Sequence, residues 1–307
     1  MARYDRAYGA RITGKASMAR GCIEAWAEGR AEVVVSVSWG KDSVAVAELA
    51  LTSQAADRVR LVWVRQRWFE NPDCPAVRDA LLARHPDARY EERWVTSTTP
   101  RRWDLRPGQV QARTVPTHRA GSVWPAERVT GIRAAESEQR ARSAAVHGEA
   151  TDRTCRPILR WSTAEVFGFL AAEGLPVHPA YAMTTRAPRA RDEIRVHSLG
   201  GADGRDWRAG WEDAHYGDAI LADRCGVAVM RALPDSQRRR VATPVLVQRV
   251  RSVVEGASPR DVTAAVLRLH RQGLVGRWER YGHEGWWRWP DRPWPIPGAA
   301  TAGDLAD

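Results

Sequence analysis

The stretch Glu32-Val-Val-Val-Ser-Val-Ser-Trp-Gly-Lys-Asp-Ser43 decides the fold. Its first half is a short β-branched run that ends in small and polar residues, which is typical of a buried strand. Residues 42–51, Asp-Ser-Val-Ala-Val-Ala-Glu-Leu-Ala-Leu, continue as an apolar helix. A turn of small residues at a helix N-terminus directs backbone N–H groups toward an anion. The stretch therefore predicts a phosphate-binding loop between a strand and a helix.

Strands and helices alternate on both sides of this loop. Residues 1–30 form a basic lead-in, with a helix expected around residues 17–28. Beyond the loop, the pattern predicts strands at 59–64, 89–95 and 128–133, and helices at 75–85 and 163–173, the last opened by a capping box at Ser162 and Glu165. The alternation indicates an α/β fold, a Rossmann-like parallel sheet with helices on both faces. The polar segment 96–126 is expected to be a functional loop, and residues 182–218 a mobile segment or lid.

The composition changes after about residue 233. Helices are expected at 244–254 and 259–272, followed by a hairpin over 273–289, which is the outline of a small winged-helix-like domain. We therefore expect four parts: an N-terminal helical lead-in (1–30), a nucleotide-binding catalytic domain (31–232), the winged-helix-like domain (233–290) and a disordered tail (291–307).

The chain of 307 residues is strongly basic, with a formal net charge of +10. Nucleic acid or an anionic small molecule is therefore a natural partner. Codon bias can account for part of this charge, because 45 of the 47 basic residues are Arg. Residues 234–292 contain 12 Arg against 6 Asp and Glu, interleaved with Trp. DNA or RNA contact is expected there at Arg260, Arg268, Arg271, Arg277 and Arg288; the alternative is a small domain that packs on the catalytic domain or forms a homodimer.

No apolar run reaches the length of a membrane span, and the N-terminus lacks the apolar core of a secretory signal. The four cysteines, Cys22, Cys74, Cys155 and Cys225, lie 52, 81 and 70 residues apart. This spacing fits neither a disulfide framework nor a CxxC-type metal site. We therefore expect a cytoplasmic, reduced protein that makes no membrane contact and carries no iron–sulfur cluster.

The loop combines groups that suit a nucleotide phosphate. Ser38 and Ser43 can donate hydroxyl hydrogen bonds beside the Gly40 turn, and Lys41 supplies a positive charge. Only Lys15 and Lys41 are lysines, so a lysine inside this motif is unlike the rest of the chain. Asp42 fits a phosphate site if Mg²⁺ bridges its carboxylate to the phosphates. The bland alternative is a strand-to-helix turn without a ligand.

A second cluster follows the strand expected at 128–133. Gly131 provides a turn, and Arg133, Glu136 and Arg140 follow within ten residues. The planar guanidinium of Arg133 suits a phosphate or sulfate, and Glu136 can position Arg133 or reach Mg²⁺. Taken alone, the pattern also describes a solvated helix with Glu–Arg pairs four residues apart.

Together these motifs resemble a known family. Residues 38–43 resemble the PP-loop signature Ser-Gly-Gly-x-Asp-Ser of the ATP pyrophosphatases, or adenine nucleotide α-hydrolases, with Trp39 in place of the first Gly. Residues 131–140, 157–162 and 174–181 resemble elements of the phosphoadenosine phosphosulfate (PAPS) reductase-like family, in the expected order over roughly residues 30–220. We expect Trp39 to take an ordinary backbone conformation, with its ring stacking on or crowding the nucleotide.

The resemblance implies an adenine nucleotide, ATP or PAPS, with Mg²⁺ held by Asp42 and with Lys41, Asp42 and Arg133 as the catalytic residues. The leading hypothesis is cleavage of ATP to AMP and pyrophosphate to activate a substrate, in sulfur transfer or modification of DNA or tRNA, with sulfur supplied by a partner protein. The first alternative is a PAPS reductase that uses Cys225, whose pKa Arg224 could lower; a structural role is favoured for Cys225 and Cys155. The second alternative is a nucleotide-responsive DNA-binding regulator without turnover.

Overall fold

The computed structural model describes residues 2–95, 101–104, 125–183, 194, 196, 198–201 and 206–289. These fall into two compact units. The first comprises residues 1–65, 71–95 and 119–197, and the second comprises residues 66–70, 96–118 and 198–307. Because the units interleave along the chain, the domain boundaries expected at residues 30, 232 and 290 stay predictions.

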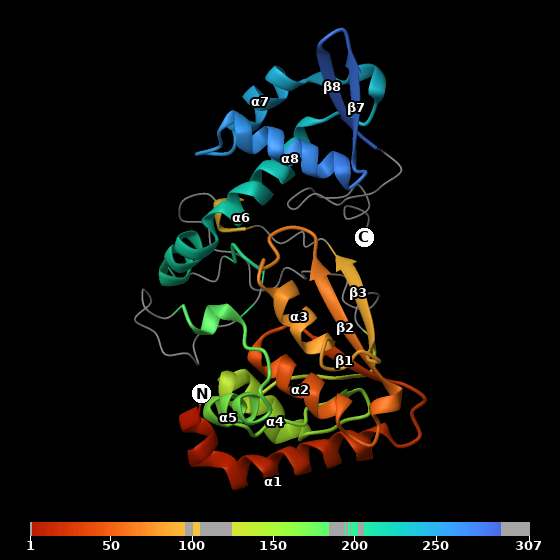
Figure 1. The fold of residues 1–307 in the computed structure, drawn as a ribbon, viewed down its shortest axis with the longest axis vertical. Coiled ribbons are helices and arrows are strands. Elements are labelled where there is room, and N and C mark those ends of the chain that lie inside the picture. Colours follow the sequence, from red (N-terminus) through yellow and green to blue (C-terminus); the bar gives the residue numbers. More distant parts are fainter. Residues whose placement is uncertain are drawn as a thin grey trace. The chain divides into compact units, whose positions relative to one another are not determined.

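The first unit is built on a five-stranded sheet (Figure 1). Its strands are β1 (Val33–Val37), β2 (Val59–Gln66), β3 (Arg89–Val95), β4 (Arg128–Val129) and β5 (Thr154–Cys155). The strand order is β3-β2-β1-β4-β5, and β1 pairs in parallel with both β2 and β4, as β4 does with β5. The predicted α/β, Rossmann-like class with a parallel sheet is confirmed.

Helices connect and cover these strands. They are α1 (Ala2–Ala27), α2 (Lys41–Leu51), α3 (Cys74–Leu82), α4 (Glu138–His147) and α5 (Thr163–Ala172). The helix α1 packs on α5 and α2 (Figure 1), and its buried side chains include Ile12, Ala16, Ala19 and Ile23. The capping box at Ser162 and Glu165 opens α5 as the sequence predicts.

The order of the strands fixes where a ligand can bind. The chain runs outward from β1 to β2 and β3, and then returns to the other side of β1 for β4 and β5. The gap between β1 and β4 is therefore the switch point, and ligands of open α/β sheets bind outside the carboxyl ends of the strands at that point. The loops that follow β1 and β4 are residues 38–40 and 130–133, the two clusters singled out in the sequence.

The second unit contains α6 (Asp206–Ala232), α7 (Thr243–Arg251) and α8 (Pro259–Arg271). A hairpin of β7 (Val275–Arg280) and β8 (His283–Arg288) follows, and the short strand β6 (Val241–Ala242) pairs with β8. The helices α7 and α8 and the hairpin lie close to where the sequence predicts them. The helix α6 was not predicted, and residues 206–218, expected to belong to a mobile segment or lid, form its first part. The assignment of this unit as a winged helix stays a prediction.

Several elements differ from their predicted bounds, the first helix and β4 most of all. The first helix begins at residue 2 instead of 17. The strand β4 ends at Val129 instead of Arg133, because the chain there turns toward the start of α2. Most of the loop expected at 96–126, much of the lid expected at 182–218 and the tail expected at 291–307 lie outside the described residues.

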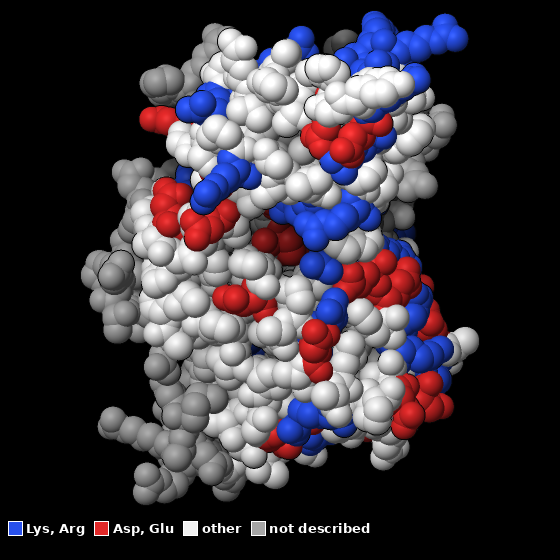
Figure 2. Space-filling model, turned by 45° about the horizontal axis from the view of Figure 1, so that its top comes forward, with Lys and Arg blue, Asp and Glu red and all other residues white. Residues whose placement is uncertain are grey.

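Charges of both signs share the surface. On the face drawn in Figure 2, acidic side chains lie beside basic ones, so the positive net charge forms no uniform basic surface there. Within the described part of the chain, no helix combines the length and apolar character that crossing a membrane requires.

Candidate nucleotide site

The loop after β1 is closed by its own serine. The Ser43 hydroxyl donates to the carbonyl of Gly40 at 3.0 Å and accepts the Ser38 backbone N–H at 3.2 Å. Gly40 is the N-cap of α2, and no side chain caps this helix end. Ser38 is exposed, whereas Gly40, Lys41 and Ser43 are buried. The uncapped first turn of α2 thus has the polarity that attracts an anion.

Trp39 differs from the sequence prediction in both its backbone conformation and the position of its ring. Its backbone lies in the left-handed region, with φ 61°, which glycine adopts without strain. Its ring is completely buried and packs edge-on against Trp63 and at a tilt against Tyr90, with centroid distances of 5.9 Å to each. The expectation of an ordinary backbone conformation and of a ring against the nucleotide is therefore wrong. The indole fills the core beneath the loop instead.

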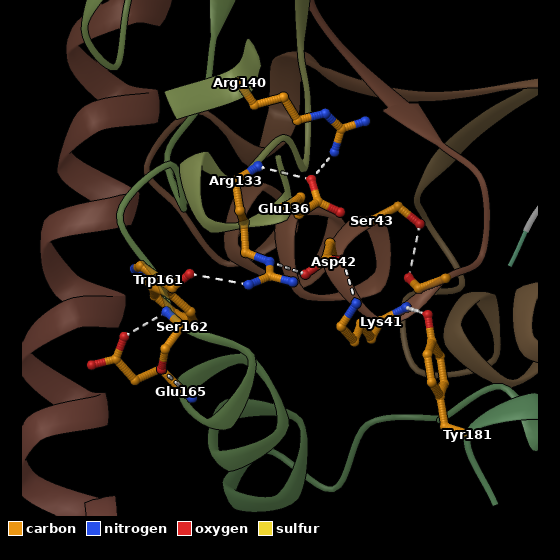
Figure 3. A network of polar contacts seen from close by, with 11 residues as sticks. Lys41, Asp42, Ser43, Arg133, Glu136, Arg140, Trp161, Ser162, Glu165 and Tyr181 are labelled. Atoms are coloured by element: carbon orange, nitrogen blue, oxygen red, sulfur yellow. Dashed lines mark hydrogen bonds and ion pairs between the residues drawn. The ribbon is translucent and has the colours of Figure 1, made fainter. Parts of the chain in front are cut away.

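Asp42 holds two cations together (Figure 3). One carboxylate oxygen lies 2.8 Å from Lys41 Nζ, and the other accepts from Arg133 Nε at 2.6 Å. Arg133 also donates to the Trp161 carbonyl at 3.2 Å. The side chains of Lys41 and Arg133 are each only 2% exposed, so these ion pairs are shielded from solvent. Two positive charges against one negative charge leave this cluster attractive to an anion.

Gly131 allows the two loops to meet. A Cβ at this position would lie 2.9 Å from the carbonyl carbon and oxygen of Asp42, which is closer than a side chain can approach. The neighbouring Thr130 hydroxyl is buried and has no hydrogen-bond partner among the described residues. A buried polar group without a partner is costly. This hydroxyl at the end of β4 therefore suits a polar ligand.

Glu136 binds the backbone of the loop that carries Arg133. Its carboxylate accepts the Arg133 backbone N–H at 3.2 Å and pairs with Arg140 (Figure 3). Glu136 thus fixes the turn that presents Arg133. Arg140 belongs to α4, whose N-cap Ser137 accepts the Arg140 backbone N–H at 3.3 Å. All nine nucleotide-site residues expected from the sequence lie on the two loops or in the first turns of the helices that follow.

Sequence reasoning missed Tyr181. Its hydroxyl accepts the Lys41 backbone N–H at 3.3 Å, and its ring lies 5.4 Å from the Lys41 ammonium. Burial, with the charge of Asp42, raises the pKa of the Tyr181 hydroxyl above its ordinary value, so the group stays neutral beside the loop. Tyr181 closes the family-like stretch at 174–181, which was the signal available in the sequence.

Cys74 and His178 were also missed as neighbours of this region. The thiol of Cys74, the first residue of α3, lies 3.8 Å from the Ser38 carbonyl. His178 is 1% exposed, and its Nδ1 accepts the Ala180 N–H at 3.1 Å. Burial lowers the pKa of His178 to about 4 against the charge of Asp73, so the ring is neutral at physiological pH.

The two cysteines weighed in the sequence are both buried. Cys225 lies buried in α6, and burial raises the pKa of its thiol to about 11 despite neighbouring Arg224. The charge of Arg224 acts to lower this pKa, as expected from the sequence, but burial and the charge of Asp261 outweigh it. Cys155 is fully buried with its sulfur 3.7 Å from that of Cys22, and this contact and burial raise its pKa. Burial of both thiols agrees with the structural role favoured from the sequence, which stays a prediction.

The arginines expected to contact nucleic acid are divided. Arg268 pairs with Asp223 at 3.0 Å and donates to the Ala222 carbonyl, and Arg277 pairs with Glu279 and Glu284. Arg260 and Arg271 are exposed on α8, and Arg288 at the end of β8 is partly exposed. Two of the five therefore bind within their own unit, and the role of the set stays a prediction.

Comparison with known proteins agrees with the resemblance stated from the motifs. Residues 109–203 match the family model described as the phosphoadenosine phosphosulfate reductase domain. This segment is therefore similar to that domain. The matched segment contains Gly131, Arg133, Glu136, Arg140 and Tyr181, whereas the loop at residues 38–43 precedes it. The predicted family resemblance is thereby confirmed.

Among solved structures, the chain is similar to the U34-tRNA thiolase NcsA from Methanococcus maripaludis, described with its 4Fe–4S cluster. The identity is 12%, the TM-score is 0.35, and the match covers 68% of this chain and 77% of the thiolase. No curated protein matches the chain.

The thiolase overturns one expectation. Scattered cysteines led us to expect no iron–sulfur cluster, but that protein carries one, so the expectation is withdrawn. Within the described ranges, no three His, Cys, Asp or Glu side chains are grouped so as to hold a metal ion.

Magnesium can fit this site only in part. Both oxygens of Asp42 already bind Arg133 and Lys41, so the geometry favours Asp42 as the anchor of those cations. Mg²⁺ in nucleotide sites is often bound through one carboxylate together with substrate phosphates. An ion carried in on the nucleotide therefore suits the residues better than an ion held by the protein alone.

Proposed function

We propose that the chain binds an adenine nucleotide at the carboxyl ends of β1 and β4 and cleaves ATP between the α and β phosphates to activate a substrate. The observation that carries this proposal is the Lys41–Asp42–Arg133 cluster at the switch point of the sheet. It joins the two loops whose motifs resemble the PP-loop and PAPS reductase families. The unpartnered Thr130 hydroxyl and the uncapped start of α2 lie on the same two loops.

Cleavage of ATP at the α-phosphate requires stabilisation of negative charge more than it requires a nucleophile from the protein. An oxygen of the substrate attacks the α-phosphorus, a new P–O bond forms, and the bond to the β-phosphate oxygen breaks as pyrophosphate leaves with the electron pair. A sulfur or nitrogen nucleophile then displaces AMP. Buried cations already held in place stabilise the charge that develops on the phosphoryl oxygens, because they need no reorganisation during the reaction.

Each residue has a distinct part in this scheme. Lys41 and Arg133 face the phosphates with positive charge, and Asp42 fixes both side chains. Glu136 holds the backbone turn that presents Arg133. Ser38, Ser43 and the backbone around Gly40 contact phosphate oxygens. Mg²⁺, where bound with the nucleotide, supplies further neutralisation of the phosphates.

The acceptor is proposed to be a nucleic acid or a sulfur-transfer substrate, because the chain carries a net charge of +10. A thiol-dependent reduction of PAPS is less well supported, since burial raises the pKa of Cys225 to about 11. Sulfur would then come from a partner protein.

The chain's two lysines provide a matched pair of variants. Lys41→Ala should lower the formation of AMP and pyrophosphate from ATP at least about 100-fold, because it removes a buried charge aimed at the phosphates. Lys15→Ala removes a lysine that pairs with Glu165 in α5, so it should leave the rate unchanged.

The measurement is nucleotide analysis after incubation with ATP and Mg²⁺, with EDTA, and with bulk tRNA or DNA. Stimulation by one nucleic acid would identify the acceptor class. Equal rates for the Lys41→Ala variant and the wild type would contradict the proposal. The proposal would also be contradicted if the wild type released no AMP under any of these conditions. In that case, binding of PAPS would be measured next.

A further inference from the structure

A cavity of about 390 Å³ lies within the second unit, apart from the residues of the nucleotide site. One face of α6 forms one wall of the cavity. It carries Arg224, Val227, Ala228 and Arg231, which recur at helical spacing. The end of α7 and the turn after it form another wall, and Phe69 with Trp103 completes the lining. Its volume falls in the range of small-molecule sites.

The charge of the lining is positive. Arg224, Arg231 and Arg249 border the cavity together with a single carboxylate, that of Asp104. No carboxylate of the described residues forms an ion pair with Arg224 or Arg249, although Arg249 donates to the Ala232 carbonyl at 3.4 Å. Arg249 is exposed, so its guanidinium is open to an anion from solvent, whereas the half-buried Arg224 lies beside the Trp103 ring.

The aromatic wall is held rigidly. Phe69 adopts φ 60°, a strained conformation for a bulky side chain, and both of its backbone groups are anchored. Its N–H donates to Asp223 and its carbonyl accepts from Leu199, each at 2.6 Å. Arg101 lies 5.3 Å above the ring. Strain that the surroundings maintain in this way clusters at ligand sites.

The pair of aromatic rings in the lining lies next to the Arg224 guanidinium. The rings of Phe69 and Trp103 lie 4.9 Å apart at 56°, and the Arg224 guanidinium lies 5.5 Å from the Trp103 ring. Nucleobases stack on aromatic rings and on guanidinium planes, and phosphates bind arginine forks. A ligand with a flat ring and one anionic group matches both halves of the lining.

We propose that this cavity is a second nucleotide site, which binds one nucleoside monophosphate unit with its base at Trp103 and Arg224 and its phosphate at Arg231 and Arg249. The unit is either a free mononucleotide or one nucleotide of a single strand. The site does not depend on the proposed ATP chemistry.

The test is equilibrium binding of the four 5′-ribonucleoside monophosphates and of a ten-nucleotide single strand, measured by calorimetry. The Lys41→Ala protein serves as background, so that the first site does not contribute. Arg224→Ala with Arg249→Ala should weaken binding at least 10-fold, whereas Arg238→Ala, an exposed arginine outside the cavity lining, should not. Circular dichroism checks that each variant is folded.

The outcomes distinguish a free mononucleotide from a nucleic-acid strand as the ligand, and they test the cavity proposal separately from the ATP-cleavage proposal. Binding of mononucleotides indicates a free ligand, and binding of the strand alone indicates nucleic acid. If neither ligand binds the Lys41→Ala protein, or if the double arginine variant binds as tightly as its background, the cavity proposal is overturned. Either result leaves the ATP cleavage measured with wild-type protein unaffected.

Discussion

At the residue scale, the carboxylate of Asp42 joins both cations of the candidate site, Lys41 and Arg133. Lys41 stands out because the chain has only two lysines, and Arg133 follows a recognisable glycine turn. That Asp42 joins them could not be predicted, since it depends on the loops after β1 and β4 approaching within contact distance. The motif pointed to Mg²⁺ at Asp42, whereas the structure shows two cations there.

Trp39 gives the clearest residue-scale test. Trp39→Gly would restore the glycine of the PP-loop signature and relieve a left-handed conformation worth about 1–2 kcal/mol. It would also remove a fully buried indole, which costs about 3–5 kcal/mol. We therefore expect a net loss of about 2–3 kcal/mol in the free energy of unfolding, measured by urea denaturation.

The half-exposed Trp289 offers a control for that substitution. Trp289→Gly should change the free energy of unfolding by less than half as much, because its ring is already partly hydrated. A Trp39→Gly protein as stable as the wild type would show that backbone strain dominates at this position, contrary to the packing argument.

At the element scale, local patterns predicted most helices and strands. Strand β3 was predicted with its observed bounds, and α5 through its capping box, because both signals lie within a few residues. The start of α1 was missed, although Ile12, Ala16, Ala19 and Ile23 repeat at helical spacing. Their polar and basic neighbours concealed the stripe, and its partner α5 lies far along the sequence.

The link between α1 and α5 depends on one buried carboxylate. Glu165 accepts the Ser162 N–H at 2.8 Å and pairs with Lys15 at 2.8 Å and Arg11 at 2.7 Å. Burial would raise the pKa of Glu165, but the bonds from Lys15 and Ser162, with the charge of Arg11, bring it below its ordinary value. The carboxylate is therefore charged in the folded protein at neutral pH.

Glu165→Gln should lower the free energy of unfolding by about 2–3 kcal/mol, because two cations lose their shared partner. The partners are partly exposed, so the loss stays below that of a fully buried pair. In a Lys15→Gln background the same substitution should cost about 1 kcal/mol less, and this coupling is measured by a double-mutant cycle in urea. Additive effects would show that Lys15 does not contribute to holding α1 on α5.

At the scale of the whole molecule, the sequence predicted the class of fold but not the order of the strands in the sheet. Alternating strands and helices indicate a parallel sheet, yet the order β3-β2-β1-β4-β5 depends on long-range pairing. The division into units was equally hidden, since residues 66–70 and 96–118 join the C-terminal unit across a large separation in sequence. The cavity of that unit, lined by residues from 69 to 254, therefore had no sequence signature.

Global stability should fall in mild acid through His178. Its pKa is about 4 in the folded chain against an ordinary 6.5, so the unfolded chain binds the extra proton between these values. Stability from this residue is thus complete above pH 6.5 and is lost as the pH falls toward 4, by about 3 kcal/mol. Protonation also removes the Nδ1 acceptor of the Ala180 N–H.

The variant His178→Asn isolates this contribution, since an asparagine oxygen can still cap Ala180 but does not titrate. Urea unfolding of both proteins from pH 7.5 to 4 should show a steeper loss of stability in the wild type, because carboxylates elsewhere titrate alike in both. Parallel pH profiles would mean that the buried imidazole gains its proton without cost, and that burial does not keep His178 neutral beside the loop.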